Sequence, residues 1–195
     1  MTKASSRVAG RPRRSSQSKS TLIWIAVLGG GAVATVVLIV ALLAPRPIPT
    51  LDGVAVYSNQ SGNHSEAPHK YPQTPPVGGV HSAQWQNCGI YDQPVQNEKA
   101  AHSLEHGAVW IAYRPDLTAG DVETLRSLAR GHSHVLLSPY PDLPKPVVAT
   151  AWGLQLSTDS ASDARLLLFI QRYEQGPQTP EPGSTCSGGI GTPIG

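Results

Sequence analysis

The chain has 195 residues and a formal net charge of +2, but this charge is distributed unevenly along it. Seven of the 15 basic residues and none of the 13 acidic ones lie between Met1 and Arg46, which leaves eight basic against 13 acidic residues in the remainder. A remainder with excess negative charge would repel phosphate, and this excludes a globally basic nucleic-acid-binding protein.

The first predicted element is an apolar segment without charged residues, at residues 22–44. It exceeds the roughly 20 residues that a helix needs to span a bilayer, whereas the apolar core of a cleaved signal peptide has about 7–15 residues. We therefore expect an uncleaved transmembrane helix, with a signal peptide as the alternative. The basic residues before it indicate a cytoplasmic N-terminus and a single-pass protein of the cell membrane.

This interpretation divides the chain into four parts. They are a basic cytoplasmic segment (1–21), the transmembrane helix (22–44), a Pro-rich spacer (45–53) and an extracytoplasmic domain with a Pro- and Gly-rich tail (54–195).

Within the outer domain, residues 54–58 are compatible with a first strand, and a long irregular stretch rich in Gly and Pro follows at 59–97. Runs of β-forming residues then predict strands at residues 108–113, 134–140 and 145–156. Amphipathic runs opened by the capping residues Thr118 and Ser160 predict helices at residues 121–131 and 164–175. The resulting β-α-β-β-α order predicts an α+β fold, with a small mixed or antiparallel sheet and two helices on one face.

The two cysteines, Cys88 and Cys186, both follow the predicted membrane helix. In an oxidising compartment such a pair most simply forms one disulfide, which would fix the C-terminal tail to the domain. A pair of thiolate metal ligands or a redox pair is the alternative, but neither cysteine belongs to a C-x-x-C motif. We predict a structural disulfide.

All seven histidines lie in the outer domain, and His81, His102 and His106 form the most informative group. In a helix, His102 and His106 stand at i and i+4, about 6 Å apart on one face, where both imidazoles can bind one ion. In a strand they would lie about 13 Å apart and could not share an ion. Good helix formers at residues 98–101 and the helix-terminating Gly107 favour the helix. His81, from the Gly-rich loop, would then complete a metal site.

The other histidines have plainer interpretations. His64 and His69 lie in a polar loop, where we expect them to be solvated. His132 and His134 flank Ser133 at the start of a predicted strand, which would place both side chains on one face about 7 Å apart. For these two we favour a surface or half-buried pair over a metal site.

Residues 102–106, with the sequence H-S-L-E-H, match the H-x-x-E-H pattern of inverted zinc peptidases, in which the Glu is a general base beside a zinc-bound water. Glu105 is therefore a candidate catalytic residue. The pattern has only three fixed residues, however, those peptidases are far larger, and no downstream acidic helix offers a third ligand. A capping and hydrogen-bonding pair of Glu105 and His106 at a helix end is the alternative, and we do not favour an enzyme.

Residues 74–117 contain a distinctive set of residues: Pro75-Pro76, Gly79, His81, Trp85, Cys88-Gly89, Tyr91 and the segment His102-Ser103-Leu104-Glu105-His106-Gly107. With these residues the chain closely resembles a bacterial family catalogued as domain of unknown function 3105, whose members have one N-terminal membrane helix and a small outer domain. The resemblance covers most of residues 54–190. It implies no activity, but it does imply that His81, His102, Glu105, His106 and Cys88 form one unit.

The sequence supports three hypotheses of function. The first is a non-catalytic module that binds a metal ion or small ligand through His81, His102 and His106; imidazole ligands suit copper or zinc. The second is a structural or interaction module, in which these residues only connect the long loop to the sheet. The third is a metal-dependent hydrolase that uses Glu105. We expect the membrane as a partner and no nucleic acid, and no pattern identifies a protein partner.

Overall fold

The computed structural model describes residues 50–58 and 60–194. The predicted membrane helix at 22–44 lies outside these residues, as do the basic segment before it and most of the spacer. Among the residues described, no helix combines the length and the apolar character needed to cross a membrane.

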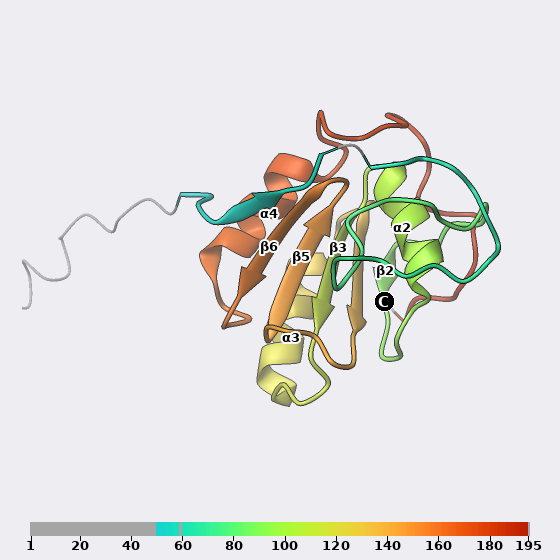
Figure 1. The fold of residues 1–195 in the computed structure, drawn as a ribbon. Coiled ribbons are helices and arrows are strands. Elements are labelled where there is room, and N and C mark those ends of the chain that lie inside the picture. Colours follow the sequence, from blue (N-terminus) through green and yellow to red (C-terminus); the bar gives the residue numbers. More distant parts are fainter. Residues whose placement is uncertain (1–49, 59, 195) are drawn as a thin grey trace, which may run out of the picture. The chain divides into compact units, whose positions relative to one another are not determined.

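A six-stranded mixed sheet forms the centre of the fold (Figure 1). Across the sheet, the order is β1 (Val54–Val56), β6 (Leu154–Thr158), β5 (Val147–Ala151), β3 (Val109–Tyr113), β4 (Val135–Pro139) and β2 (Gly89–Ile90). Strand β4 runs parallel to its neighbours β2 and β3, and the other neighbouring strands are antiparallel. The central strands β3, β4 and β5 are buried along their whole length, as their unbroken apolar runs require.

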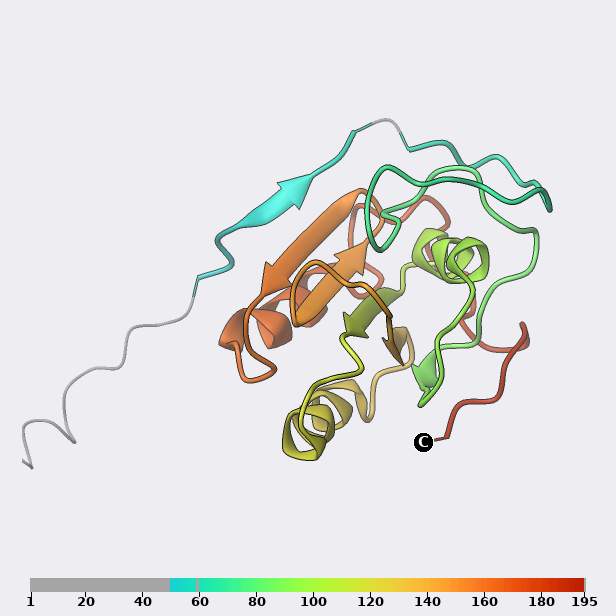
Figure 2. The ribbon, with the colours of Figure 1, turned by 60° about the horizontal axis from the view of Figure 1, so that its bottom comes forward.

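Helices cover both faces of this sheet (Figure 2). On one face, α3 (Ala119–Ala129) and α4 (Ala164–Tyr173) contribute side chains such as Leu125 and Phe169 to the larger hydrophobic core. On the other face, α2 (Asn97–Glu105) packs Leu104 into a second core beside Trp110 of β3. The predicted α+β fold is confirmed, including the two helices that share one face.

One predicted strand is wrong. Residues 145–156 form not one strand but the hairpin β5–β6, which turns at Trp152-Gly153. Gly153 has φ +70°, and a Cβ at this position would lie 2.9 Å from the carbonyl oxygen of Tyr57. Only glycine satisfies both demands, and its position in the middle of an apolar run marks the turn. The predicted cap of the last helix is also displaced, because Asp163 rather than Ser160 caps α4.

Two segments without regular structure lie against the side of α2 that faces away from the sheet (Figures 1 and 2). The first, residues 60–87, bonds to the first turns of α2 through the N–H groups of Ser82 and Gln86. The second, residues 176–191, reaches the end of α2 where the N–H of Glu181 donates to the carbonyl of Glu105. The predicted disulfide is confirmed and fixes this tail, since the sulfur atoms of Cys88 and Cys186 are 2.02 Å apart.

Candidate metal centre

Helix α2 presents three polar side chains to the two covering segments. His102, Glu105 and His106 are each only 5% exposed, and their spacing of three and four residues places them on one side of the helix. The helix ends directly after them, because Gly107 adopts φ +94° and two successive N–H groups return to carbonyls of the last turn in a Schellman motif. The predicted helix over His102 and His106 is confirmed, and the two ring centroids are 4.6 Å apart.

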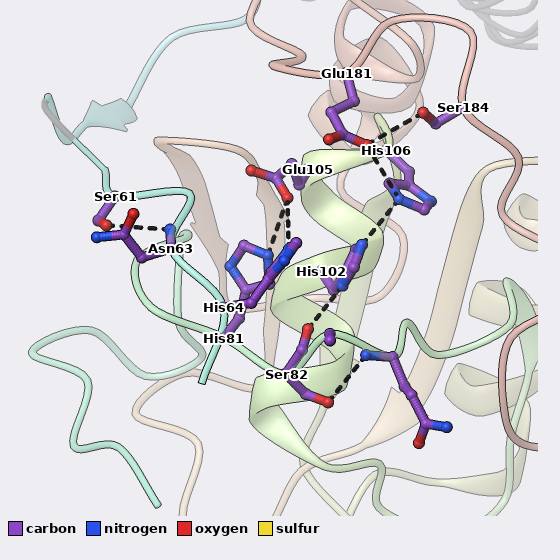
Figure 3. Close-up of polar contacts among 12 residues, drawn as sticks. Ser61, Asn63, His64, His81, Ser82, His102, Glu105, His106, Glu181 and Ser184 are labelled. Atoms are coloured by element: carbon purple, nitrogen blue, oxygen red, sulfur yellow. Dashed lines mark hydrogen bonds and ion pairs between the residues drawn. The ribbon is translucent and has the colours of Figure 1, made fainter. Parts of the chain in front are cut away.

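His81 approaches the same point from the Gly-rich loop (Figure 3). It is fully buried, and its Nε2 lies 3.0 Å from Oε2 of Glu105. Its backbone forms an isolated β-bridge with His64, and this pairing holds Nε2 of His64 3.6 Å from the same carboxylate oxygen. The ring of His64 also stacks on that of His102, with centroids 4.8 Å apart. Two loop histidines and two helical residues therefore meet at one place.

Backbone carbonyls orient three of the imidazole rings. In each ring, Nδ1 lies 2.7 Å from a carbonyl oxygen: His81 with Gly79, His102 with Ser82 and His106 with Thr185. Because a carbonyl can only accept, each Nδ1 carries the hydrogen, and Nε2 of the neutral ring presents a lone pair. Metal-binding histidines are commonly held in this way by their second nitrogen.

Nitrogen and oxygen atoms of the cluster converge. Ligand atoms of His64, His81, His102 and Glu105 all lie within 4.8 Å of one another. On the other side of His102, its Nε2 is 3.0 Å from Nε2 of His106. Burial lowers the pKa of His102, and the neighbouring rings add to this shift, so its neutral form is favoured. Two ring nitrogens that face each other so closely repel unless a shared cation, a proton or a metal ion, lies between them.

Two tryptophans form apolar walls around the cluster. The Trp85 ring centroid lies 5.0 Å from that of His106 and 5.8 Å from that of His102, and Trp152 lies 5.7 Å from His81. Apolar walls of this kind limit the access of water and strengthen interactions between charges inside the site.

The three predicted ligands do not all belong to one group of converging ligand atoms. His81 and His102 belong to the four-residue group, whereas His106 adjoins His102 on its far side. Metal binding by His81, His102 and His106 therefore stays a prediction. Two further residues join the cluster that the sequence did not indicate: His64, and Glu181 from the tail, whose Oε2 is 3.4 Å from Nε2 of His106.

The interpretation of the loop histidines needs correction. His64 is not simply solvated: its side chain is 43% exposed, but it is also in contact with Glu105 and His102. His69 is half-buried. The local composition around His64 did not indicate its place in the cluster, because only the pairing of two irregular segments brings His64 there.

His132 and His134 lie away from this cluster and precede β4 rather than belonging to it. Both bind the carboxylate of Glu174, His132 through Nδ1 and His134 through its backbone N–H. Only His132 is half-buried as expected; His134 is buried, 6% exposed, and the carboxylate of Glu174 lies between the two. One acidic residue at the end of α4 explains their position without a metal ion.

The comparisons with known proteins agree with this picture. The family described as protein of unknown function (DUF3105) matches residues 63–188, about two thirds of the chain. The chain belongs to this family. The matched segment contains the whole cluster from His64 to Glu181 and both cysteines, but not the predicted membrane helix. No curated protein and no solved structure matches the chain.

Proposed function

We propose that this chain is a membrane-anchored extracytoplasmic domain that binds a copper or zinc ion. The ligands are His64, His81, His102 and Glu105. The observation that carries the proposal is the convergence of one ligand atom from each residue within 4.8 Å, in a place where three of the four side chains are buried. The family carries no function that would decide the matter.

The spacing of the ligand atoms suits an ion. Metal–ligand distances of about 2.1 Å place tetrahedral ligand atoms roughly 3.4 Å apart, and atoms at right angles roughly 3.0 Å apart. Oxygen Oε2 of Glu105 is already 3.0 Å from Nε2 of His81 and 3.6 Å from Nε2 of His64. Since His64 is the exposed member, its loop can supply the remaining approach.

The donor atoms favour particular ions. Imidazole nitrogen and carboxylate oxygen suit zinc and divalent copper, whereas monovalent copper prefers thiolate or thioether sulfur. Both cysteines are bonded to each other and cannot act as thiolates. The site therefore favours the divalent ions.

The contacts of Glu105 favour a ligand over a general base. A base must be free to face a metal-bound water, but Oε2 of Glu105 already points at the Nε2 atoms of His64 and His81. For this reason we place hydrolysis last among the candidate functions.

A structural module is the second candidate, and one observation favours it. The side chains already contact the two covering segments, His81 facing Glu105 and Nδ1 of His106 donating to the carbonyl of Thr185, so that hydrogen bonds alone can connect the loop and the tail to α2. In this case substitutions in the cluster lower the melting temperature, and added metal changes nothing.

The proposed location rests on sequence and chemistry together. The apolar segment 22–44 and the basic residues before it favour an anchor with the domain outside. A disulfide between Cys88 and Cys186 is also what an oxidising compartment permits. Protease added to intact cells that express the chain should remove the domain and spare the N-terminus. Protection of the whole chain would contradict this topology.

Metal content tests the binding proposal. The full chain, purified in mild detergent and loaded with Zn²⁺ or Cu²⁺, should retain metal at the cluster after dialysis against a weak chelator. Glu105→Gln preserves the shape of the side chain but removes an anionic ligand, and His64→Ala removes a partly exposed one. Each variant should weaken the affinity for the bound metal ion by about 10–100-fold, as measured by chelator competition.

His69→Ala provides the matched control, because it removes a half-buried histidine of the same loop without touching the cluster. Retention should be unchanged in this variant. A wild-type chain that loses all metal, or that keeps it undiminished in both Glu105→Gln and His64→Ala, would exclude the proposed site.

A further inference from the structure

We infer that the cluster accommodates a second metal ion, bound by His102, His106 and Glu181 beside the first. This inference rests on the proposed function for the first ion. Its basis is that the cluster contains two ligand sets of the same composition, each with two imidazole nitrogens and one carboxylate oxygen.

The two sets have closely similar dimensions. In the inner set, the Nε2 atoms of His81 and His64 lie 3.0 and 3.6 Å from Oε2 of Glu105. In the outer set, Nε2 of His106 lies 3.0 Å from Nε2 of His102 and 3.4 Å from Oε2 of Glu181. All four distances are close to the roughly 3.0–3.4 Å that separates two ligand atoms on one metal ion.

Hydrogen bonds hold the outer set from two sides. The carbonyls of Ser82 and Thr185 bind Nδ1 of His102 and His106, so both rings turn their Nε2 lone pairs toward each other. Two hydrogen bonds position Glu181: its backbone N–H donates to the carbonyl of Glu105, and its Oε2 accepts from the hydroxyl of Ser184. Figure 3 shows these side chains arriving from α2 and from the tail. Glu181 is 49% exposed, so the outer set opens to solvent.

His102 connects the two sets. Its ligand atom lies within 4.8 Å of the ligand atoms of His64, His81 and Glu105, while its Nε2 also faces His106. One imidazole nitrogen binds one ion, so His102 is a ligand of the first ion when a single ion is present and of the second ion when both are bound. The two ions are then close neighbours, as in two-metal centres with ions about 3.5–4 Å apart.

The second ion should bind more weakly than the first. The second ion is repelled by the positive charge of the first ion, and its binding removes His102 from the ligands of the first ion. We expect two ions per chain at saturation, with a second dissociation constant at least about tenfold the first. Zn²⁺ in equilibrium dialysis gives the stoichiometry, and Cu²⁺ gives the distance, because the magnetic dipole interaction between neighbouring Cu²⁺ ions broadens their electron paramagnetic resonance signal.

Glu181→Gln is the decisive variant, because this exposed side chain can change without disturbing the core. It should reduce the stoichiometry from two to one and remove the magnetic coupling, while the affinity for the first ion stays within about threefold. His106→Ala should act in the same way. Glu123→Gln, a similarly exposed glutamate on α3, is the matched control and should keep both ions.

The outcomes separate this inference from the proposed function. A wild-type chain that saturates at one ion, lost in Glu105→Gln, supports the proposed function and overturns the second site. Two uncoupled ions, or two ions that persist in Glu181→Gln, also overturn it, because the second ion then lies elsewhere. A wild-type chain that binds no ion overturns both.

Discussion

The disulfide offers the sharpest test of how the cluster is held together. Cys88 follows directly on the first irregular segment and is bonded to Cys186 of the tail, 98 residues later in the sequence. The tail supplies Thr185, whose carbonyl orients His106, and Glu181. The perturbation is the double substitution Cys88→Ala/Cys186→Ala, which removes the crosslink without leaving a free thiol.

The magnitude follows from the length of the closed loop. For a loop of about 100 residues, the lost entropy of the unfolded chain corresponds to about 4.7 kcal/mol at 25 °C. For a domain of about 150 residues, each kcal/mol shifts the melting temperature by about 2–4 °C. The double variant should therefore melt at least about 10 °C below the wild type.

Thermal unfolding followed by circular dichroism, with a chelator present in both samples, measures this difference. The chelator matters, because bound metal would stabilise the two proteins unequally. Ser187→Ala, an exposed position beside Cys186, serves as a control with an expected change near zero. A fall of less than about 3 °C would refute the reasoning, because the backbone bonds of the tail would then suffice to hold it.

Three further predictions concern separate features. Gly107→Ala should lower the free energy of unfolding by more than about 1 kcal/mol, as measured by urea unfolding. Gly107 has φ +94°, and an added Cβ would lie 3.0 Å from Cα of Gln175. An unchanged unfolding midpoint would mean that this turn relaxes to accept the Cβ. The hydrogen bonds of Arg165 hold the pKa of Asp163 below its ordinary 3.8, so this carboxylate stabilises the fold above about pH 4 and loses that effect as the pH falls through its folded pKa. The loss of melting temperature in Asp163→Asn should accordingly be full near pH 7 and shrink progressively as the pH falls below about 4. A loss that is the same at every pH would mean that the charge of Asp163 does not contribute. Zn²⁺ at about 100 times its dissociation constant should add about 2.7 kcal/mol to the free energy of unfolding, measured as a rise in melting temperature, and an equal rise in Glu105→Gln would show that the ion binds elsewhere.

Local patterns predicted the parts of the fold that local physics determines. Helix α3 follows from the Thr118 cap, whose side chain does accept from the N–H of Asp121, and from the apolar stripe that reaches Leu125. The end of α2 follows from Gly107, and with it the approach of His102 to His106. Each of these features depends on neighbours within about one helical turn, which a single sequence displays directly.

The features that the sequence did not predict depend mainly on contacts between segments distant in the sequence. His64 reaches Glu105 through a β-bridge between two irregular stretches, and Glu181 reaches His106 from a tail that follows 75 residues later. No periodicity marks either residue, since neither belongs to a helix or strand. The hairpin at Gly153 was missed for the opposite reason: two short buried strands in succession resemble one long apolar run.

The burial of Glu105 is the strongest physical reason to expect a cation in the cluster. A carboxylate that is 5% exposed pays a large desolvation penalty unless a positive charge is close to it. Within residues 60–194, its ion-pair partners are the imidazoles of His64 and His81, which are cations only when protonated. A divalent ion supplies the missing charge without relying on a proton, and it joins α2 to a loop that is distant in sequence. Binding of the ion is then coupled to the folding of that loop, as it is at structural metal sites.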